Sequence, residues 1–194
     1  MKKTVFVLLL VAGCSTTSLT DSWQSPNLKR GQLDNVLVVA ATANPTYRVL
    51  FERSFVQALK DKGIDATASI DVIGNSNPTR EAVMAYLKKS NARYVSVTRY
   101  GGSEITQEVI PGHATNYVVG GYYGTLSGYW DANVVTIEQQ SYVETTTTVT
   151  LTTSMFDVKT EELVWAGRSK SFEMGSIAYG ATDLARLMVG AIKN

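Results

Sequence analysis

The chain of 194 residues has the length of one domain. Its 18 Lys and Arg residues nearly balance its 17 Asp and Glu residues, so the composition gives no general electrostatic reason to bind nucleic acid. One cysteine excludes an internal disulfide framework and a cysteine-based zinc cluster, and one histidine excludes sites with two His ligands. Hydrophobic residues make up 44% and charged residues 18%, which is typical of a folded chain and not of a disordered one.

The first 13 residues have the pattern of a secretory signal peptide. Lys2 and Lys3 precede the apolar run Val5–Ala12, which is too short for a membrane-spanning helix of roughly 20 residues. The segment LVAGC that ends at Cys14 resembles a bacterial lipobox. This resemblance implies cleavage between Gly13 and Cys14 and attachment of lipid acyl chains to Cys14, which becomes the link to the membrane lipid. The alternative is an ordinary signal peptide followed by an unmodified cysteine.

The residue after the cysteine bears on the location of the protein. In enterobacterial lipoproteins an aspartate at this position retains the protein in the inner membrane, and here the residue is Ser15. The resemblance therefore implies a lipid-anchored protein of the outer membrane whose domain faces the periplasm. Residues 14–33 are polar with little periodicity and predict a flexible tether. Its one bulky residue, Trp23, packs on the domain or rests at the lipid interface.

Residues 34–194 predict a single α/β domain with a mixed β-sheet and about three helices. The expected order is β-α-β-α-β, an insert, and then β-β-α. We expect strands at 35–41, 64–72, 93–100, 141–157 and 163–169, and helices at 45–62, 77–90 and 176–193.

Two segments carry the clearest local signals. The run from Asn35 to Ala41 is continuously apolar and predicts a buried central strand. Asn44 and Pro45 then provide a helix cap and a first turn, and Gly63 supplies the usual C-terminal glycine. The apolar face of this helix is expected to contain Tyr47, Phe51, Phe55, Ala58 and Leu59.

A glycine- and tyrosine-rich insert occupies about residues 101–135. Its aromatic residues are the candidate partner surface, because Tyr and Trp contribute strongly to protein interfaces: Tyr117, Tyr122, Tyr123, Tyr129 and Trp130. Three alternatives remain open: an ordered loop or hairpin on its own sheet, a partner-binding surface, or a hairpin that lines a pore or touches the membrane. The poor apolar alternation over residues 116–137 argues against the pore.

Catalytic motifs are missing from the sequence. No phosphate-binding loop or nucleophile elbow occurs, and His113 is the only histidine that could serve as a base or a ligand. Glu161 and Glu162 are adjacent carboxylates in an expected turn, where we expect them to be solvated, and Asp157 is expected to shape that turn through backbone N–H groups. We therefore expect no catalytic residues, no metal site, no cofactor beyond the lipid on Cys14, and no enzymatic activity.

The expected hairpin Met155–Ser169 is similar to one in small outer-membrane lipoproteins, where a related turn ending in Leu-Val-Trp joins the last two strands. That broad group includes the penicillin-binding-protein activator LpoB, the curli secretion lipoprotein CsgG and uncharacterised families, whose core resembles the N-terminal domain of TolB. The resemblance covers roughly residues 34–193. It implies an architecture and a binding or assembly role, because the members that can be named are not enzymes.

The sequence therefore predicts an outer-membrane-anchored lipoprotein whose non-catalytic domain binds another cell-envelope component as an adaptor or activator. The partner is expected to be an envelope protein or part of the peptidoglycan machinery, and not nucleic acid. The alternative is an oligomeric secretion or pore component that resembles CsgG.

Overall fold

The computed structural model describes residues 17–74, 77–119, 126–127, 133–172 and 176–193. The chain forms two compact units. Unit 1 comprises the residues up to Glu104 and those from Thr147 onward, and unit 2 comprises Ile105–Thr146. Two long strands, β4 (Tyr94–Ile110) and β7 (Tyr142–Asp157), each contribute residues to both units. The architecture is mixed α/β, as the sequence predicts.

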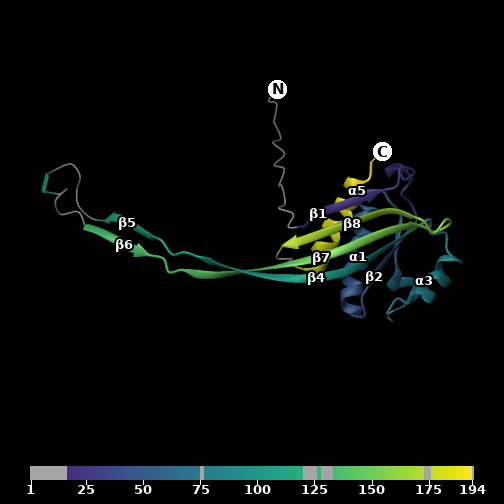
Figure 1. Cartoon of the computed structure of the whole chain (residues 1–194), viewed down its shortest axis with the longest axis horizontal. Coiled ribbons are helices and arrows are strands. Elements are labelled where there is room, and N and C mark those ends of the chain that lie inside the picture. The colour runs from purple at the N-terminus through teal and green to yellow at the C-terminus, as the bar shows by residue number, and fades with distance from the viewer. Residues whose placement is uncertain (1–16, 75–76, 120–125, 128–132, 173–175, 194) are drawn as a thin grey trace, which may run out of the picture. The chain divides into compact units, whose positions relative to one another are not determined.

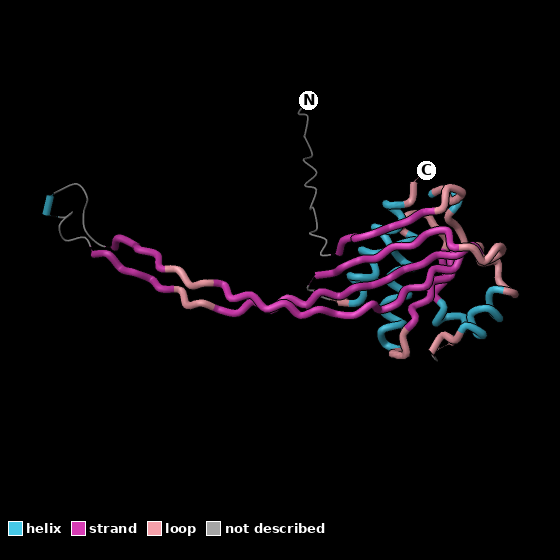
Figure 2. The backbone as a smooth tube through the Cα atoms, viewed as in Figure 1, coloured by secondary structure: helices cyan, strands magenta, loops and turns pink. Residues whose placement is uncertain are grey.

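Unit 1 is built on a six-stranded mixed sheet with the order β1-β8-β7-β4-β2-β3. Its other strands are β1 (Thr17–Gln24), β2 (Val36–Ala41), β3 (Ala66–Ala68) and β8 (Leu163–Phe172). β2 runs parallel to β3 and β4, whereas β8 is antiparallel to β1 and β7. Figures 1 and 2 show these strands side by side with the helices packed over the sheet.

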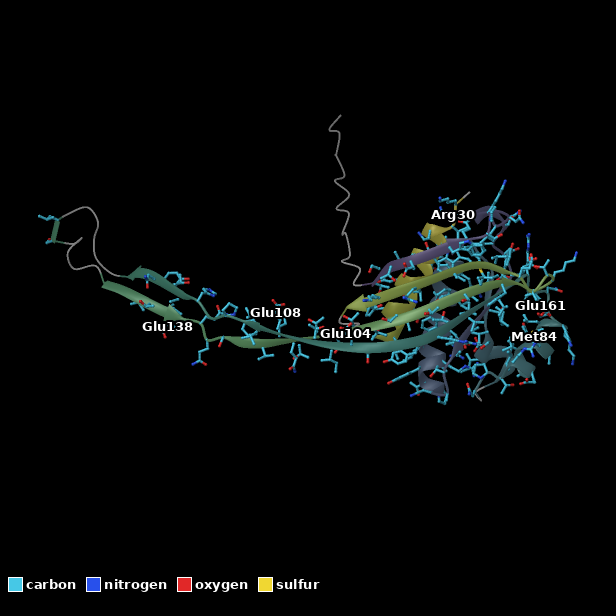
Figure 3. The ribbon with its side chains drawn as sticks, viewed as in Figure 1. Arg30, Met84, Glu104, Glu108, Glu138 and Glu161 are labelled. Atoms are coloured by element: carbon cyan, nitrogen blue, oxygen red, sulfur yellow. The ribbon has the colours of Figure 1, made fainter. Side chains whose placement is uncertain are left out.

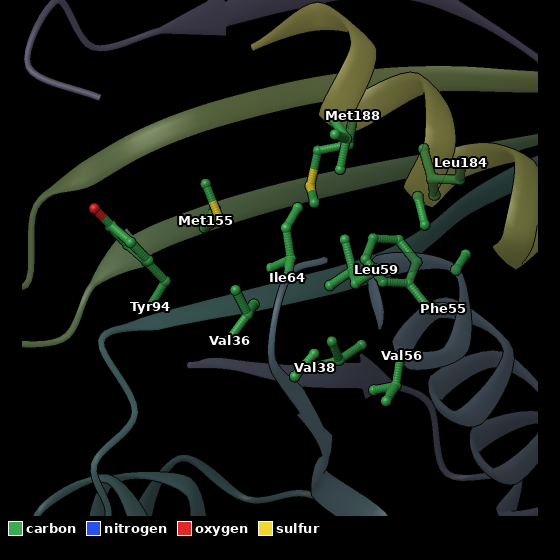
Figure 4. Close-up of a cluster of buried hydrophobic side chains, with 14 of the residues drawn as sticks. Val36, Val38, Phe55, Val56, Leu59, Ile64, Tyr94, Met155, Leu184 and Met188 are labelled. Carbon is green, nitrogen blue, oxygen red and sulfur yellow. The ribbon is translucent and has the colours of Figure 1, made fainter. Parts of the chain in front are cut away.

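Helices α1 (Pro45–Lys60) and α5 (Ile177–Ala191) pack together over one face of this sheet. The core beneath them joins Phe55 and Leu59 of α1 to Leu184 and Met188 of α5, all fully buried, and Figure 4 shows these side chains in one cluster with Val36 and Met155. Asn44 caps α1 by accepting from the Tyr47 N–H, as predicted. Most of the predicted apolar face of α1 is buried, but Tyr47 is half exposed.

Helix α3 (Arg80–Leu87) packs against the opposite face of the sheet. Alternate residues of β2 and β4 face this second core, in which Leu37, Val39 and Val95 pack against Leu87. Because both faces of β2 are covered, its apolar run is continuous, as a buried parallel strand requires.

The prediction of a flexible tether is wrong for residues 17–33, the part of the predicted tether that the structure describes. Thr17–Gln24 forms the edge strand β1, paired antiparallel with β8. Leu28 and Leu33 are buried in the main core, and a 3₁₀ turn (Arg30–Gln32) lies between them. The polar composition of residues 17–24 does not indicate a strand, because β1 lies at the edge of the sheet, where one side of a strand remains in water.

Two further boundaries differ from prediction. The strand expected over residues 64–72 is only Ala66–Ala68, and it is followed at once by the short helix α2 (Ser69–Ile73). The next helix does not begin at Asn77 and Pro78, because Thr79 caps it by accepting from the Ala82 N–H. Asn77 and Thr79 are both residue types that can cap a helix, and the sequence alone did not decide between them.

The insert predicted at about residues 101–135 contains regular strands. β4 continues to Ile110, and β5 (Ala114–Val119) pairs antiparallel with β6 (Asn133–Glu138) in a separate two-stranded sheet. The described part of the insert is therefore an ordered hairpin, which is compatible with a partner-binding surface. The aromatic residues between β5 and β6 fall outside the described residues.

The turn between β7 and β8 has the role predicted for Asp157. Its carboxylate oxygen accepts from the N–H groups of Lys159 and Thr160 at 2.9 and 3.1 Å. On the returning strand, Trp165 is 1% exposed and belongs to the main core. Its indole lies over Gly167, where a Cβ atom would overlap the ring.

Candidate binding surfaces

The predicted lipidation and cleavage residues, Gly13 and Cys14, lie outside the described residues. The first described residue is Thr17, at the start of β1. Only Ser15 and Thr16 separate Cys14 from this strand in the sequence. No helix in the described part of the chain is long and apolar enough to cross a membrane.

Of the five aromatic residues predicted as a partner surface, the structure describes Tyr117. It lies on β5 with 51% of its surface exposed. The other four, Tyr122, Tyr123, Tyr129 and Trp130, lie outside the described residues. The aliphatic residues Val135 and Ile137 of β6 are also exposed and lie near Tyr117. The sequence analysis missed them because it considered only aromatic residues.

The β5–β6 sheet has one apolar face. Tyr117 lies directly opposite Val135, and Thr115 lies opposite Ile137, so these four side chains share a face. Val135 and Ile137 are 44% and 57% exposed. We call Tyr117, Val135 and Ile137 the β5–β6 apolar face.

The other face of this sheet carries polar side chains at Asn116, Thr136 and Glu138. Asn116 lies opposite Thr136, and the threonine hydroxyl donates to the Asn116 amide oxygen at 2.8 Å. Glu138 shares this face. Around the Asn116–Thr136 and Tyr117–Val135 pairs, one face of the sheet is therefore polar and the other apolar, and an isolated two-stranded sheet is marginally stable in water. Its apolar face is a surface that gains stability when it is covered.

The sequence of unit 2 contains acidic residues but no Lys or Arg. No Lys or Arg occurs between Arg99 and Lys159, whereas unit 2 contains Glu108, Asp131, Glu138 and Glu144. Figure 3 labels two of these carboxylates, Glu108 and Glu138, on the strands of unit 2. This unit therefore favours a partner surface that is apolar or basic over one that is acidic.

Unit 1 contains a separate apolar pocket of about 440 Å³. Its floor is formed by the sheet, and its walls are formed by the first turns of α1 and α5. The lining residues are Ala40, Ala41, Thr42, Asn44, Tyr47, Phe51, Thr98, Tyr100, Val149, Leu151, Ile177 and Ala181. We call this the α1–α5 pocket. Its volume falls within the roughly 300–1,000 Å³ of pockets that hold small ligands.

The position of the α1–α5 pocket follows from the topology. From β2 the chain crosses through α1 to β3 on one side, whereas β4 adds to the other side of β2. The carboxyl ends of β2 and β4 therefore meet at a point where strand order reverses, the usual place for a crevice in an open α/β sheet. The sequence prediction missed the pocket because its lining comes from five segments that only the fold assembles.

The residues considered for catalysis do not come together. His113 is exposed, and its backbone oxygen accepts from the Gln139 N–H. Glu161 and Glu162 are exposed in the β7–β8 turn. Among the described residues, no group of three or more His, Cys, Asp or Glu side chains could hold a metal ion.

A buried ion pair on α1 forms the centre of a polar cluster in unit 1. Arg48 Nε lies 3.2 Å from Glu52 Oε1, and both side chains are completely buried. The Ser69 hydroxyl donates to Glu52 and accepts from Arg48 at 2.8 Å. Glu52 also accepts from the N–H groups of Ala40 and Ile70. Every contact of Glu52 is internal, so the cluster joins α1 to β2 and α2 and offers no open position for a substrate.

The pKa of the Tyr94 hydroxyl is shifted from its usual value. Burial raises the pKa of the Tyr94 hydroxyl above its usual value of 10, the nearby Arg93 guanidinium opposes this rise, and the Asp157 carboxylate adds to it. Arg93 lies over the Tyr94 ring, 5.2 Å from its centroid. Tyr94 is 3% exposed and lies in the core, so this shift reflects packing and not a reactive site.

Solved structures with a similar fold include PelC. A PelC variant from Paraburkholderia phytofirmans, solved as a dodecamer, aligns with a TM-score of 0.50 at 16% sequence identity, covering 90% of this chain and 97% of that chain. A second PelC dodecamer from the same organism gives a TM-score of 0.49 at 16% identity and covers 92% and 99%. No family model matches the sequence, and no curated protein matches it.

Proposed function

We propose that this chain is an outer-membrane-anchored lipoprotein whose domain binds another cell-envelope component without catalysing a reaction on it. The lipobox-like segment ending at Cys14 supports the anchor. The observation that carries the binding role is the β5–β6 apolar face, which exposes Tyr117, Val135 and Ile137 in a sheet of only two strands.

The partner surface is expected to be apolar where it meets this face and neutral or basic around it. Burying three such side chains would contribute several kcal/mol, since full burial of one large apolar side chain contributes about 1.5–3 kcal/mol. The carboxylates of unit 2 would then select against acidic partners, because they meet no compensating Lys or Arg within the unit.

The anchor is tested by the intact mass of the mature protein from cell membranes. The wild-type protein should begin at Cys14 and carry the added mass of acyl chains, and the Cys14→Ser protein should lack this mass and leave the membrane fraction. A wild-type protein of unmodified mass would contradict the anchor and leave the binding role of unit 2 to be judged separately.

The binding role is tested by a photoreactive benzoylphenylalanine placed at Tyr117 in the full chain in intact cells. The matched control places the same residue at Asn116, the neighbouring position on the polar face. A discrete adduct at Tyr117 that is at least tenfold stronger than at Asn116 is expected. Equal adducts at both positions, or none at Tyr117, would contradict binding through this face.

A second candidate function is an assembly of several copies that acts in secretion or as a pore. It is supported by the fold similarity to PelC, which is a dodecamer in its crystals. Light scattering of the lipidated protein in mild detergent, with the detergent mass subtracted, tests it. A closed ring of copies would favour this function, and a monomer would exclude it.

A further inference from the structure

The α1–α5 pocket is not used by the proposed partner surface, which lies in unit 2. None of its lining residues carries a charge. Several of its polar groups are already engaged: the Thr98 hydroxyl bonds with that of Thr153 at 2.9 Å, and the Asn44 amide oxygen caps α1. A ligand of this pocket is therefore held by apolar contact, and its chemistry is that of a hydrocarbon chain.

The shape of the pocket lining also fits a chain that enters from the end of the sheet. Phe51, Leu151 and Ala181 lie deeper and are wholly or partly buried. Tyr47 and Tyr100, which are 51% and 60% exposed, line the pocket as amphipathic rings that keep one side in water. A chain entering past these rings would place its methylenes against the buried residues.

Thr17, at the start of β1, lies in the same row of paired residues as Val149 of the pocket. Thr17 pairs with Ser171, and Ser171 pairs with Val149, which lines the pocket. Directly opposed residues share a face, and the 3.0 Å bond between the Thr17 and Ser171 hydroxyls agrees with this. Thr17 is therefore on the pocket face, two strand spacings from Val149, or about 10 Å.

Cys14 precedes Thr17 by three residues, which span at most about 11 Å when extended. The distance from Thr17 to the pocket is of the same size. An acyl chain attached at Cys14 is consequently within reach of the α1–α5 pocket without any change in the described part of unit 1.

We propose that the α1–α5 pocket holds a fatty acyl chain, and that this chain is one of those attached to Cys14 of the same molecule. The proposal rests on the lipidation of Cys14 that is part of the proposed function. Because each methylene gains about 0.8 kcal/mol on leaving water for either the pocket or the bilayer, exchange between the two is nearly balanced. The pocket thereby sets how many chains remain in the membrane and how firmly the protein is anchored.

The test uses the full chain, made in cells fed a fatty acid with a photoreactive diazirine, and irradiated in the intact cells. Peptide mapping then locates the crosslinks formed by the acyl chains of Cys14. Crosslinks are expected within the same molecule, in peptides that contain Ala40–Tyr47 or Ile177–Ala181. Crosslinks only to bilayer lipid would overturn the proposal.

A matched pair of variants makes the result specific. Val149 lines the pocket from β7, on the same face of the sheet as Leu151 and Met155, and it is partly exposed, so Val149→Trp fills the pocket. Thr152 is exposed on the opposite face of β7 and is not among the pocket residues, so Thr152→Trp is the control. The intramolecular crosslink should fall at least tenfold in Val149→Trp and stay unchanged in Thr152→Trp, with equal melting temperatures. An equal yield in both variants would overturn the proposal.

The Cys14→Ser protein tests whether the acyl chain in the pocket comes from Cys14 or from bilayer lipid. It is mixed with vesicles of phosphatidylethanolamine and phosphatidylglycerol that contain a diazirine acyl chain. No crosslink to the pocket peptides is expected, whereas a yield equal to that of the wild-type protein would assign the pocket to bilayer lipid and overturn the own-chain proposal. Intact mass measured on the same wild-type samples distinguishes the proposed lipid anchor at Cys14 from the proposed occupation of the pocket. Acylated protein without pocket crosslinks contradicts only this inference, and protein without acyl mass contradicts the proposed anchor as well.

Discussion

Arg48 and Glu52 are one helical turn apart on α1, and neither side chain has any exposed surface. Glu52 accepts four further contacts, from the Ala40 and Ile70 N–H groups and twice from the Ser69 hydroxyl. The pair therefore connects the helix to the end of β2 and to the start of α2. Removing the Glu52 charge would leave the buried guanidinium of Arg48 without its carboxylate.

We expect Glu52→Gln to lower the free energy of unfolding by about 3–5 kcal/mol, the usual cost of breaking a buried ion pair. The control is Asp71→Asn, which breaks the exposed Arg53–Asp71 pair at 2.7 Å and should cost less than about 1 kcal/mol. Urea denaturation at pH 7 measures both. Equal losses in the two variants would show that burial does not decide the contribution of the Arg48–Glu52 pair.

A second prediction concerns Gly167, which the Trp165 indole covers. Gly167→Ala should force the ring or the strand to shift and lower the free energy of unfolding by about 1–3 kcal/mol. Gly190 lies in α5, where an added Cβ would point into open space. Gly190→Ala should instead stabilise by about 0.4–1 kcal/mol, because the unfolded chain loses freedom. Opposite shifts in melting temperature are expected, and shifts of the same sign would contradict the overlap at Gly167.

A third prediction tests the turn between β7 and β8. Asp157→Ala removes the acceptor for the N–H groups of Lys159 and Thr160, and should cost about 1–3 kcal/mol for the two bonds. Asp157→Asn keeps an amide oxygen at this position and should cost less. The urea midpoints of the two variants give the comparison. An Asn variant as unstable as the Ala variant would show that the loss of stability does not come from loss of the hydrogen-bond acceptor.

A fourth prediction follows from the raised pKa of Tyr94. Because the folded protein holds the Tyr94 proton more tightly than the unfolded chain, this contribution to stability is complete below about pH 10, the unfolded value. It is lost as the pH rises from there through the raised pKa of the folded state. Tyr94→Phe keeps the ring but has no proton to lose.

Melting temperatures between pH 8 and pH 11 measure this effect. The wild-type protein should lose stability more steeply than Tyr94→Phe above pH 10, and the two should run in parallel below it. Parallel curves over the whole range would assign the alkaline loss to other groups.

Elements that depend on neighbouring residues could be predicted from the sequence. Asn44 caps α1 and Gly63 follows it with a positive φ of 77°, both of which need only local chemistry. The β7–β8 hairpin was predictable for the same reason, since strand alternation and the acceptor at Asp157 lie within one stretch of chain.

Features that depend on distant partners could not be predicted in this way. β1 is a strand because β8, almost 150 residues later in the chain, offers it a free edge. Glu52 is buried because Ser69 and the N–H groups of Ala40 and Ile70 meet it. The α1–α5 pocket exists only where β2, β4, β7 and two helix starts meet, so no single segment carries a signal for it.

The stretch without Lys or Arg between Arg99 and Lys159 has a practical consequence. Trypsin finds no cleavage site there, so a digest returns all of unit 2 in one long fragment. Reagents that couple to amines find no lysine side chain there either. A partner that contacts only unit 2 would leave no product with such reagents, and a survey based on them would report only the neighbours of unit 1.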